Sequence, residues 1–257
     1  MSTQQLGEME VLNFEGMQPP TPEDVERLGG CLYLCGRLKA LYLIGCTGLA
    51  SLPDSIGACA SLEKLYLTGC NGLAVLPDGI GRCVALETLS LDGCTGLASL
   101  PDSISRCVAL TTLRLDRCTR LASIPESIGG CTALTKLSLY GCTGMASLPE
   151  SIGACVALEE LSLRRCTGLA SLPDSIGRCV ALKTLDLYGC ARLVSLPDGI
   201  GACVALEELY LYGCTGLASL PDMSSADSQG LTVRDMPESL RPWKVWYGTR
   251  SLVSMRS

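Results

Sequence analysis

Apolar positions recur with a fixed period of 24 residues along most of this chain. The unit reads LxxLxLxGCTGLASLPDSIGxCVA and repeats without insertion or deletion. A fixed period of this length is typical of repeat proteins, in which one unit buries its apolar face only against its neighbours. Eight units begin at Leu38, Leu62, Leu86, Leu110, Leu134, Leu158, Leu182 and Leu206.

Each unit predicts one strand and one short helical turn. The segment 65–67 alternates inward leucines with an outward variable residue, which is the period-two pattern of a strand. The segment 49–57 spaces its apolar residues by three and four, with Pro53 to open a helical turn and Gly57 to end it. We therefore expect a right-handed α/β solenoid, with an eight-stranded parallel concave sheet plus cap strands and with helical turns on the convex side.

The consensus LxxLxLxxC followed by LxxLPxxI resembles the leucine-rich-repeat family across residues 38–222. The motif CTGLxxLPxSIG is most similar to the LPxSIG-type repeats of plant intracellular immune receptors and related cytosolic proteins. The resemblance implies a horseshoe-shaped solenoid that binds a macromolecule on its concave sheet. The 257 residues contain none of the nucleotide-binding or signalling modules of those receptors, so effector sensing is not carried over.

The two ends of the sequence predict caps on the repeats. Residues 1–37 hold a half-repeat, because apolar positions 25, 28, 32 and 35 precede those of the first unit by one period. The eight repeats span 38–229, and 230–257 form a C-terminal cap and tail with a shortened strand at 231–233. We expect Trp243, Trp246 and Tyr247 to form a lid over the last repeat, with a partner-binding hot spot as the alternative.

Charge and composition narrow the function classes. The net charge of −6 and the pI near 4.8 disfavour nucleic acid and anionic membranes as partners. The absence of histidine removes the commonest general base and the Ser/His and Cys/His nucleophile arrangements. Neither a secretory signal nor a bilayer-spanning apolar stretch is visible. We therefore expect a cytoplasmic, non-enzymatic protein without a cofactor, and the oligomeric state stays open.

Sixteen of the seventeen cysteines fall in two columns. We expect a buried ladder of free thiols, because zinc needs four thiolates converging as a tetrahedron and a column offers collinear sulfurs. Disulfides between adjacent units are sterically near the allowed separation, but a reducing cytoplasm disfavours them. The first column is Cys46, Cys70, Cys94, Cys118, Cys142, Cys166, Cys190 and Cys214, and the second is Cys35, Cys59, Cys83, Cys107, Cys131, Cys155, Cys179 and Cys203.

A column of carboxylates follows the prolines on the predicted convex side. A calcium ladder is one interpretation, but the ligand spacing of known calcium loops is missing. The preferred interpretation places each carboxylate in the first turn of its own short helix, where free N–H groups and the helix dipole favour it. No metal site is therefore expected. The column is Asp54, Asp78, Asp102, Glu126, Glu150, Asp174, Asp198 and Asp222.

The outward strand positions vary between units that are otherwise nearly identical. Six of the eight tyrosines occur there: Tyr42, Tyr66 and Tyr210 between the two strand leucines, and Tyr140, Tyr188 and Tyr212 at the next outward position. A basic island of Arg114, Arg117, Lys136, Arg164 and Arg165 lies in the middle of the same face. Arg117 and Arg165 replace a glycine that the other six units carry.

These positions predict reversible recognition of a protein partner on the concave sheet. Tyr140, Arg164, Tyr188 and Tyr212 share one outward position, with Tyr210 beside them, and tyrosine and arginine are enriched among interface hot spots. We expect the partner to contact units five to eight more than units one to four. The alternatives are a sensor of a small anionic ligand at the arginines, an accessory subunit that positions a separate enzyme, and a silent surface whose tyrosines reflect strand propensity.

Overall fold

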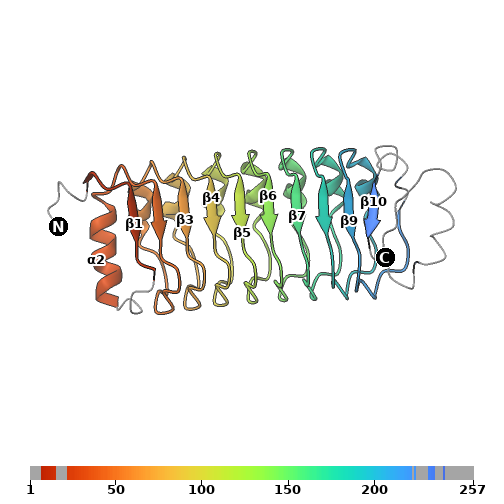
Figure 1. Cartoon of the computed structure of the whole chain (residues 1–257), viewed down its shortest axis with the longest axis horizontal. Helices are drawn as coiled ribbons and strands as arrows, with labels where there is room; N and C mark the ends of the chain where they lie inside the picture. Colours follow the sequence, from red (N-terminus) through yellow and green to blue (C-terminus); the bar gives the residue numbers. More distant parts are fainter. Residues whose placement is uncertain (1–6, 16–21, 222, 224–230, 235–239, 241–257) are drawn as a thin grey trace.

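The computed structural model describes residues 7–15, 22–221, 223, 231–234 and 240. Ten parallel strands form one sheet in the order of the sequence, side by side along the long axis (Figure 1). Eight strands come from the eight repeats and one is added at each end, which confirms the predicted solenoid with its cap strands. The strands are β1 Val11–Asn13, β2 Ala40–Tyr42, β3 Lys64–Tyr66, β4 Thr88–Ser90, β5 Thr112–Arg114, β6 Lys136–Ser138, β7 Glu160–Ser162, β8 Thr184–Asp186, β9 Glu208–Tyr210 and β10 Thr232–Arg234.

The strand register is constant along the solenoid. Leu41 pairs with Leu65, Leu65 with Leu89, and the same pairing continues to β9. These central leucines are buried, as are those two residues further on, such as Leu67 and Leu91. Because every unit has the same length, equivalent side chains lie directly beside one another, and the residues between the leucines form rows on the exposed face of the sheet.

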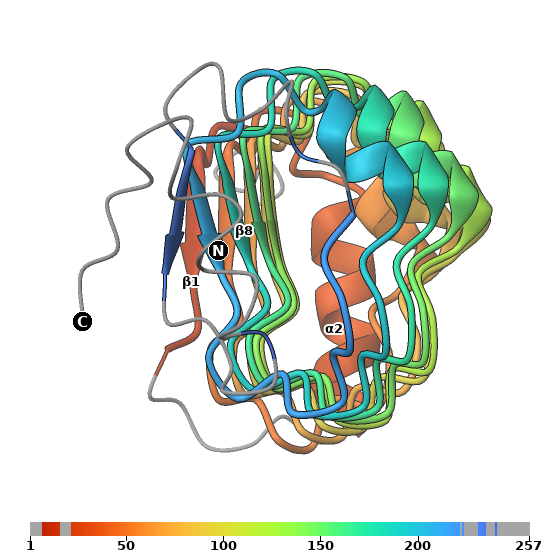
Figure 2. The same ribbon diagram turned by 90° about the vertical axis from the view of Figure 1, so that its right-hand side faces the viewer.

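The opposite side of the solenoid carries one short 3-10 helix for each of seven described units (Figure 2). Each begins after a proline and ends at a cysteine of the second column; the amide of Ile56, for example, donates to the carbonyl of Pro53 over 3.0 Å. The expected convex turns are therefore confirmed. They are η1 Asp54–Ala58, η2 Asp78–Arg82, η3 Asp102–Arg106, η4 Glu126–Gly130, η5 Glu150–Ala154, η6 Asp174–Arg178 and η7 Asp198–Ala202.

The N-terminal half-repeat replaces the 3-10 helix by the α-helix α2, Pro22–Leu32. It packs against η1 and buries Leu28 and Leu32 at the N-terminal end of the core. Gly29 stands in α2 where the first repeat has Pro53, so no proline interrupts the helix there. Trp243, Trp246 and Tyr247, which we expected to form the lid at the other end, lie outside the described residues.

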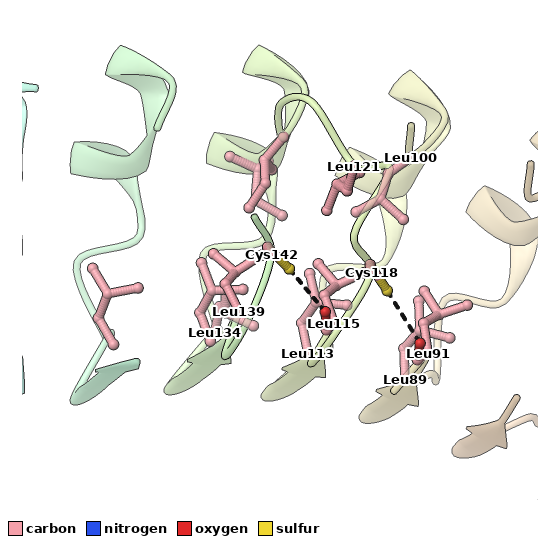
Figure 3. Close-up of a cluster of buried hydrophobic side chains, with 14 of the residues drawn as sticks. Leu89, Leu91, Leu100, Leu113, Leu115, Cys118, Leu121, Leu134, Leu139 and Cys142 are labelled. Carbon is pink, nitrogen blue, oxygen red and sulfur yellow. Dashed lines mark hydrogen bonds between the residues drawn. The ribbon is translucent and has the colours of Figure 1, made fainter. Parts of the chain in front are cut away.

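Leucines and the two cysteine columns fill the core. Figure 3 shows Cys118 and Cys142, whose thiols donate to the carbonyls of Leu91 and Leu115 in the preceding unit over 3.2 and 3.0 Å. The second column makes the same kind of bond, as from Cys131 to a helix carbonyl at 3.3 Å. All sixteen column cysteines are buried and all seventeen thiols are free, so the ladder is a structural feature of the core.

The described carboxylates of the column lie in the first turn of their own short helices, as expected, but two of them bond to the next unit. Asp54 lies in the first turn of η1, but no side chain caps that helix. Instead, Asp54 Oδ1 accepts from the amide of Gly79 in the next unit at 2.7 Å, and Glu126 accepts from Ser151 in the next unit at 3.0 Å. These two carboxylates therefore accept hydrogen bonds from free N–H groups of the neighbouring helix, because the stacked units lie close enough together.

No group of three or more His, Cys, Asp or Glu side chains in the described part of the chain could hold a metal ion. No described helix is both long and apolar enough to cross a membrane.

Candidate functional site

The second outward row on the sheet face brings arginine and tyrosine into continuous contact. The guanidinium carbon of Arg164 lies 4.0 Å from the ring centre of Tyr188. The rings of Tyr188 and Tyr212 stack with centres 5.0 Å apart and planes inclined by 25°. Stacking of this kind holds each side chain in place while Tyr212 remains 55% exposed.

Tyr140 continues this row toward the N-terminus and lies between two arginines of the neighbouring units. The guanidinium carbon of Arg117 lies 5.5 Å from the ring centre, and Arg165 Nη1 lies 3.4 Å from the phenolic oxygen. A hydrogen bond from Arg117 and the charge of Arg165 lower the pKa of Tyr140 below its ordinary value. Arg117, Tyr140, Arg164, Arg165, Tyr188 and Tyr212 are called the recognition cluster below.

Arg117 and Arg165 adopt left-handed backbone conformations, with φ of 60° and 58°. They are the only non-glycine residues with positive φ in the described part of the chain. The other six units have glycine there, with φ between 72° and 76°. An L-residue in this region costs about 1–2 kcal/mol, and such strain collects at functional sites. In the sequence, the replacement of a glycine that six units share is the signal of this strained conformation.

The expected basic island is smaller than the sequence suggested. Arg114 Nε lies 2.7 Å from Asp92 and its Nη2 lies 3.1 Å from Asp116, so its charge is neutralised locally. Lys136 pairs with Glu160 at 2.7 Å. These pairs form because the carboxylates stand beside the cations in neighbouring rows. Of the five residues of the island, Arg117, Arg164 and Arg165 are therefore the ones without an ion-pair partner among the described residues.

Asp116 is a supporting residue that the sequence analysis missed. Its Oδ1 accepts from the amide of Tyr140 at 3.0 Å and from the hydroxyl of Ser138, while its own amide donates to Asp92 at 3.1 Å. Asp92, Asp116, Arg114 and Tyr140 also line an open hollow of about 390 Å³. The network fixes the backbone from which Tyr140 projects. In the sequence, Asp116 is one acidic residue at an outward position, and nothing there indicates its supporting role.

The other three predicted tyrosines make ring contacts of their own outside the recognition cluster. Tyr42 and Tyr66 form their own stack at the N-terminal end, with ring centres 4.9 Å apart and planes 7° apart. Tyr210 donates to Glu208 over 2.9 Å, and the guanidinium carbon of Arg234 lies 5.7 Å from its ring centre. The sheet face thus carries separate aromatic groups at its two ends.

Comparison with known proteins gives matches among solved structures, whereas no family model and no curated protein sequence matches. The chain is similar to the leucine-rich repeat domain of the type III effector XopL, with 30% identity and a TM-score of 0.64, over 81% of this chain and 69% of that one. It is also similar to a leucine-rich-repeat protein of Leptospira interrogans, with 24% identity and a TM-score of 0.69, over 92% of this chain.

The likeness to the Leptospira protein concerns the fold alone, and the chain spans 56% of that protein's length. The likeness to the XopL domain extends to the sequence of the repeats. Together with the ten-stranded parallel sheet and the unbroken 24-residue period, it establishes the family. The chain belongs to the leucine-rich-repeat family, whose solenoids serve generally as protein-interaction modules.

Proposed function

We propose that this chain recognises a protein partner on the concave face of its sheet, with the recognition cluster as the centre of the interface. The observation that carries the proposal is a row of contacts in two adjoining parts. Tyr140 lies between Arg117 and Arg165. Arg164, the residue before Arg165, stacks on Tyr188, which stacks on Tyr212. Arginine and tyrosine provide large contact area and hydrogen bonds at small entropic loss when they are held in place before binding. Because the cluster lies in the middle and C-terminal repeats, units five to eight supply most of the contact.

The proposal includes a non-enzymatic role in a reducing cytoplasm. The lack of histidine and the seventeen free thiols support it. Residues 1–37 and 230–257 act as caps on the repeats of 38–229. The repeat motif is similar to the repeats of plant intracellular immune receptors, and this similarity supports a role in recognition.

A small anionic ligand is the second candidate, and the observation that favours it is specific. Arg117, Arg164 and Arg165 have no carboxylate within ion-pair distance among the described residues, in a chain with a net charge of −6. Anions bind where several guanidinium groups converge. In this version of the function, the stacked tyrosines flank the ligand instead of contacting a protein.

Substitution on the sheet face separates the two candidates. A pull-down from the source cell supplies the partner, and calorimetric titration then compares Tyr188→Ala and Arg164→Ala with the unchanged chain. We expect each variant to weaken binding by about 2 kcal/mol, the usual size of a hot-spot effect. Their circular dichroism spectra should stay unchanged, since both side chains lie on the surface of the sheet.

Tyr66→Ala is the matched control, because it removes an equivalent stacked ring from the other end of the same face. We expect it to change the affinity by less than either cluster variant does. Unchanged affinity for both Tyr188→Ala and Arg164→Ala would rule out the cluster as the interface. Equal losses for Tyr66→Ala and Tyr188→Ala would contradict the emphasis on units five to eight.

A further inference from the structure

We propose that Arg117, Tyr140 and Arg165 form an anion clamp for a phosphate monoester group that the partner carries. This inference rests on the proposed function, because the clamp is the N-terminal end of the recognition cluster. It adds the chemical class of the group that the partner must present.

The first observation is the convergence of two positive charges on one neutral side chain. Arg117 belongs to the fourth unit and Arg165 to the sixth, and both approach the ring of Tyr140 in the fifth. Two guanidinium groups at one site repel each other unless an anion lies between them. The neighbouring cations Arg114 and Lys136 each have a carboxylate partner, whereas the described residues offer none to this pair.

The second observation is that the repeat scaffold does not need these arginines. Six of the eight units form the same left-handed turn with glycine. Glycine also stands in the unit after each arginine: a Cβ added to Gly141 would lie 3.5 Å from Arg117 Cγ, and one added to Gly189 would lie 3.3 Å from Arg165 Cγ. The absence of a side chain there lets each arginine lie across the next turn. Strained backbone that is not required by the scaffold points to a binding role.

The third observation is the donor set. Each guanidinium presents a fork of N–H groups that matches two oxygens of a phosphate or carboxylate, and a phenol adds one more donor. Two forks and one hydroxyl suit a doubly charged group with three free oxygens better than a carboxylate with two. The carboxylates of Asp92 and Asp116 lie nearby, but Arg114 is paired with both and reduces their repulsion of an incoming anion.

The surroundings favour a phosphate carried on a peptide over a free anion. The adjoining hollow of about 390 Å³ is open, so a small ion bound there would keep much of its contact with water. Arg164, next to Arg165 in the sequence, leads directly onto the stacked rings of Tyr188 and Tyr212. A phosphorylated peptide could place its phosphate in the clamp while its neighbouring residues cover these rings.

Titration of the full-length chain tests the clamp with three probes: inorganic phosphate, a short peptide with one phosphoserine and a flanking leucine, and the same peptide with glutamate in place of phosphoserine. The amide NMR signals of residues 117, 141 and 165 report binding at the clamp. We expect the phosphopeptide to bind more tightly than both other probes. Arg117→Gly and Arg165→Gly should each weaken it about tenfold or more, since each removes a charge-assisted fork.

Arg120→Gly is the matched control, because it removes an exposed arginine of the same unit at a position where most other units have glycine. It should leave phosphopeptide binding unchanged. An equal loss in Arg120→Gly, or equal binding of the glutamate peptide, would overturn the clamp. If inorganic phosphate binds as tightly as the phosphopeptide and shows the same losses, the phosphate site is supported and its source is a free anion.

The clamp and the proposed function can fail separately. Loss of phosphopeptide binding in Arg117→Gly, together with unchanged partner affinity in Tyr188→Ala and Arg164→Ala, supports the clamp and contradicts the recognition cluster as a protein interface. Unchanged phosphopeptide binding in both Arg117→Gly and Arg165→Gly overturns the clamp, whatever the partner titrations give.

Discussion

At the scale of single residues, Arg117 and Arg165 are positions where the requirements of the scaffold and of the surface site differ. Their left-handed backbone is a conformation that glycine adopts without strain and that an L-residue adopts at a cost. The same two side chains meet Tyr140 on the sheet face. A residue that strains the fold and contributes to a surface site lowers stability in favour of binding. Such a loss of stability is frequent at functional sites.

Glycine at these two positions should therefore stabilise the fold. In Arg117→Gly and Arg165→Gly, relief of the left-handed strain outweighs the larger backbone entropy that glycine gives the unfolded chain. We expect each variant to raise the free energy of unfolding by about 0.5–1 kcal/mol, measured by urea denaturation at constant m-value. Arg120→Gly is again the control, because Arg120 has no left-handed backbone strain that glycine could relieve. Destabilisation by both cluster variants would show that the arginines are part of the structural framework.

At the scale of elements, hydrogen bonds between units hold successive repeats together in addition to the sheet. In the first cysteine column, the seven thiols from Cys70 to Cys214 each donate to a carbonyl that lies 27 residues earlier in the chain, as from Cys118 to Leu91. The carbonyl stands just after the preceding strand, where it accepts from the amide three residues further on, as Leu91 does from Cys94 at 3.0 Å, and has a second lone pair for the thiol. A thiol is small enough to fit the apolar core and polar enough to satisfy this acceptor.

Removal of one such thiol should weaken the fold more than removal of a cysteine outside the columns. Cys118→Ala removes the thiol bond to the Leu91 carbonyl, which keeps the amide of Cys94 as a donor, and opens a small void. We expect a loss of about 1–2 kcal/mol in chemical denaturation. Cys31→Ala, at the partly exposed cysteine outside the columns, should change stability by less than about 0.5 kcal/mol. Equal effects would show that the column bond contributes nothing measurable.

At the scale of the whole molecule, the thiols share one electrostatic property. Burial raises the pKa of all sixteen column cysteines above the ordinary value of 9.0. For Cys83 and Cys131 the pKa rises to about 12. The columns run from the half-repeat to the eighth unit, so this property extends over the full length of the core.

The raised pKa values predict unfolding at alkaline pH. The unfolded chain loses its thiol protons near pH 9 while the folded chain retains them, so stability is fully present below pH 9 and falls as the pH rises toward 12. Each thiol whose pKa rises to about 11 or above contributes about 1.4 kcal/mol per pH unit in this window, so these thiols together exceed the about 5–15 kcal/mol by which domains are stable.

A pH titration followed by circular dichroism and thiolate absorbance checks this prediction. We expect both signals to change together in one steep transition within about one pH unit above 9. Thiol labelling of the native chain at neutral pH should reach Cys31 and few of the others. Thiolate absorbance that appears near pH 9 with the fold intact would mean that water reaches the columns.

The sequence by itself determined the repeat architecture, the inward leucines, the cysteine columns and the outward positions of the six tyrosines. It could do so because an unbroken 24-residue period makes the register of each strand a property of chain length, and alternation then assigns every side chain to a face. The tertiary structure decided what those outward side chains contact. Arg114 is neutralised and Arg165 is not because carboxylates stand beside one and a phenol beside the other. Asp54 likewise bonds the next helix and not its own. These contacts join residues 22 to 25 positions apart, where rotamers and the spacing of stacked units set the distances, and no local pattern of the chain encodes them.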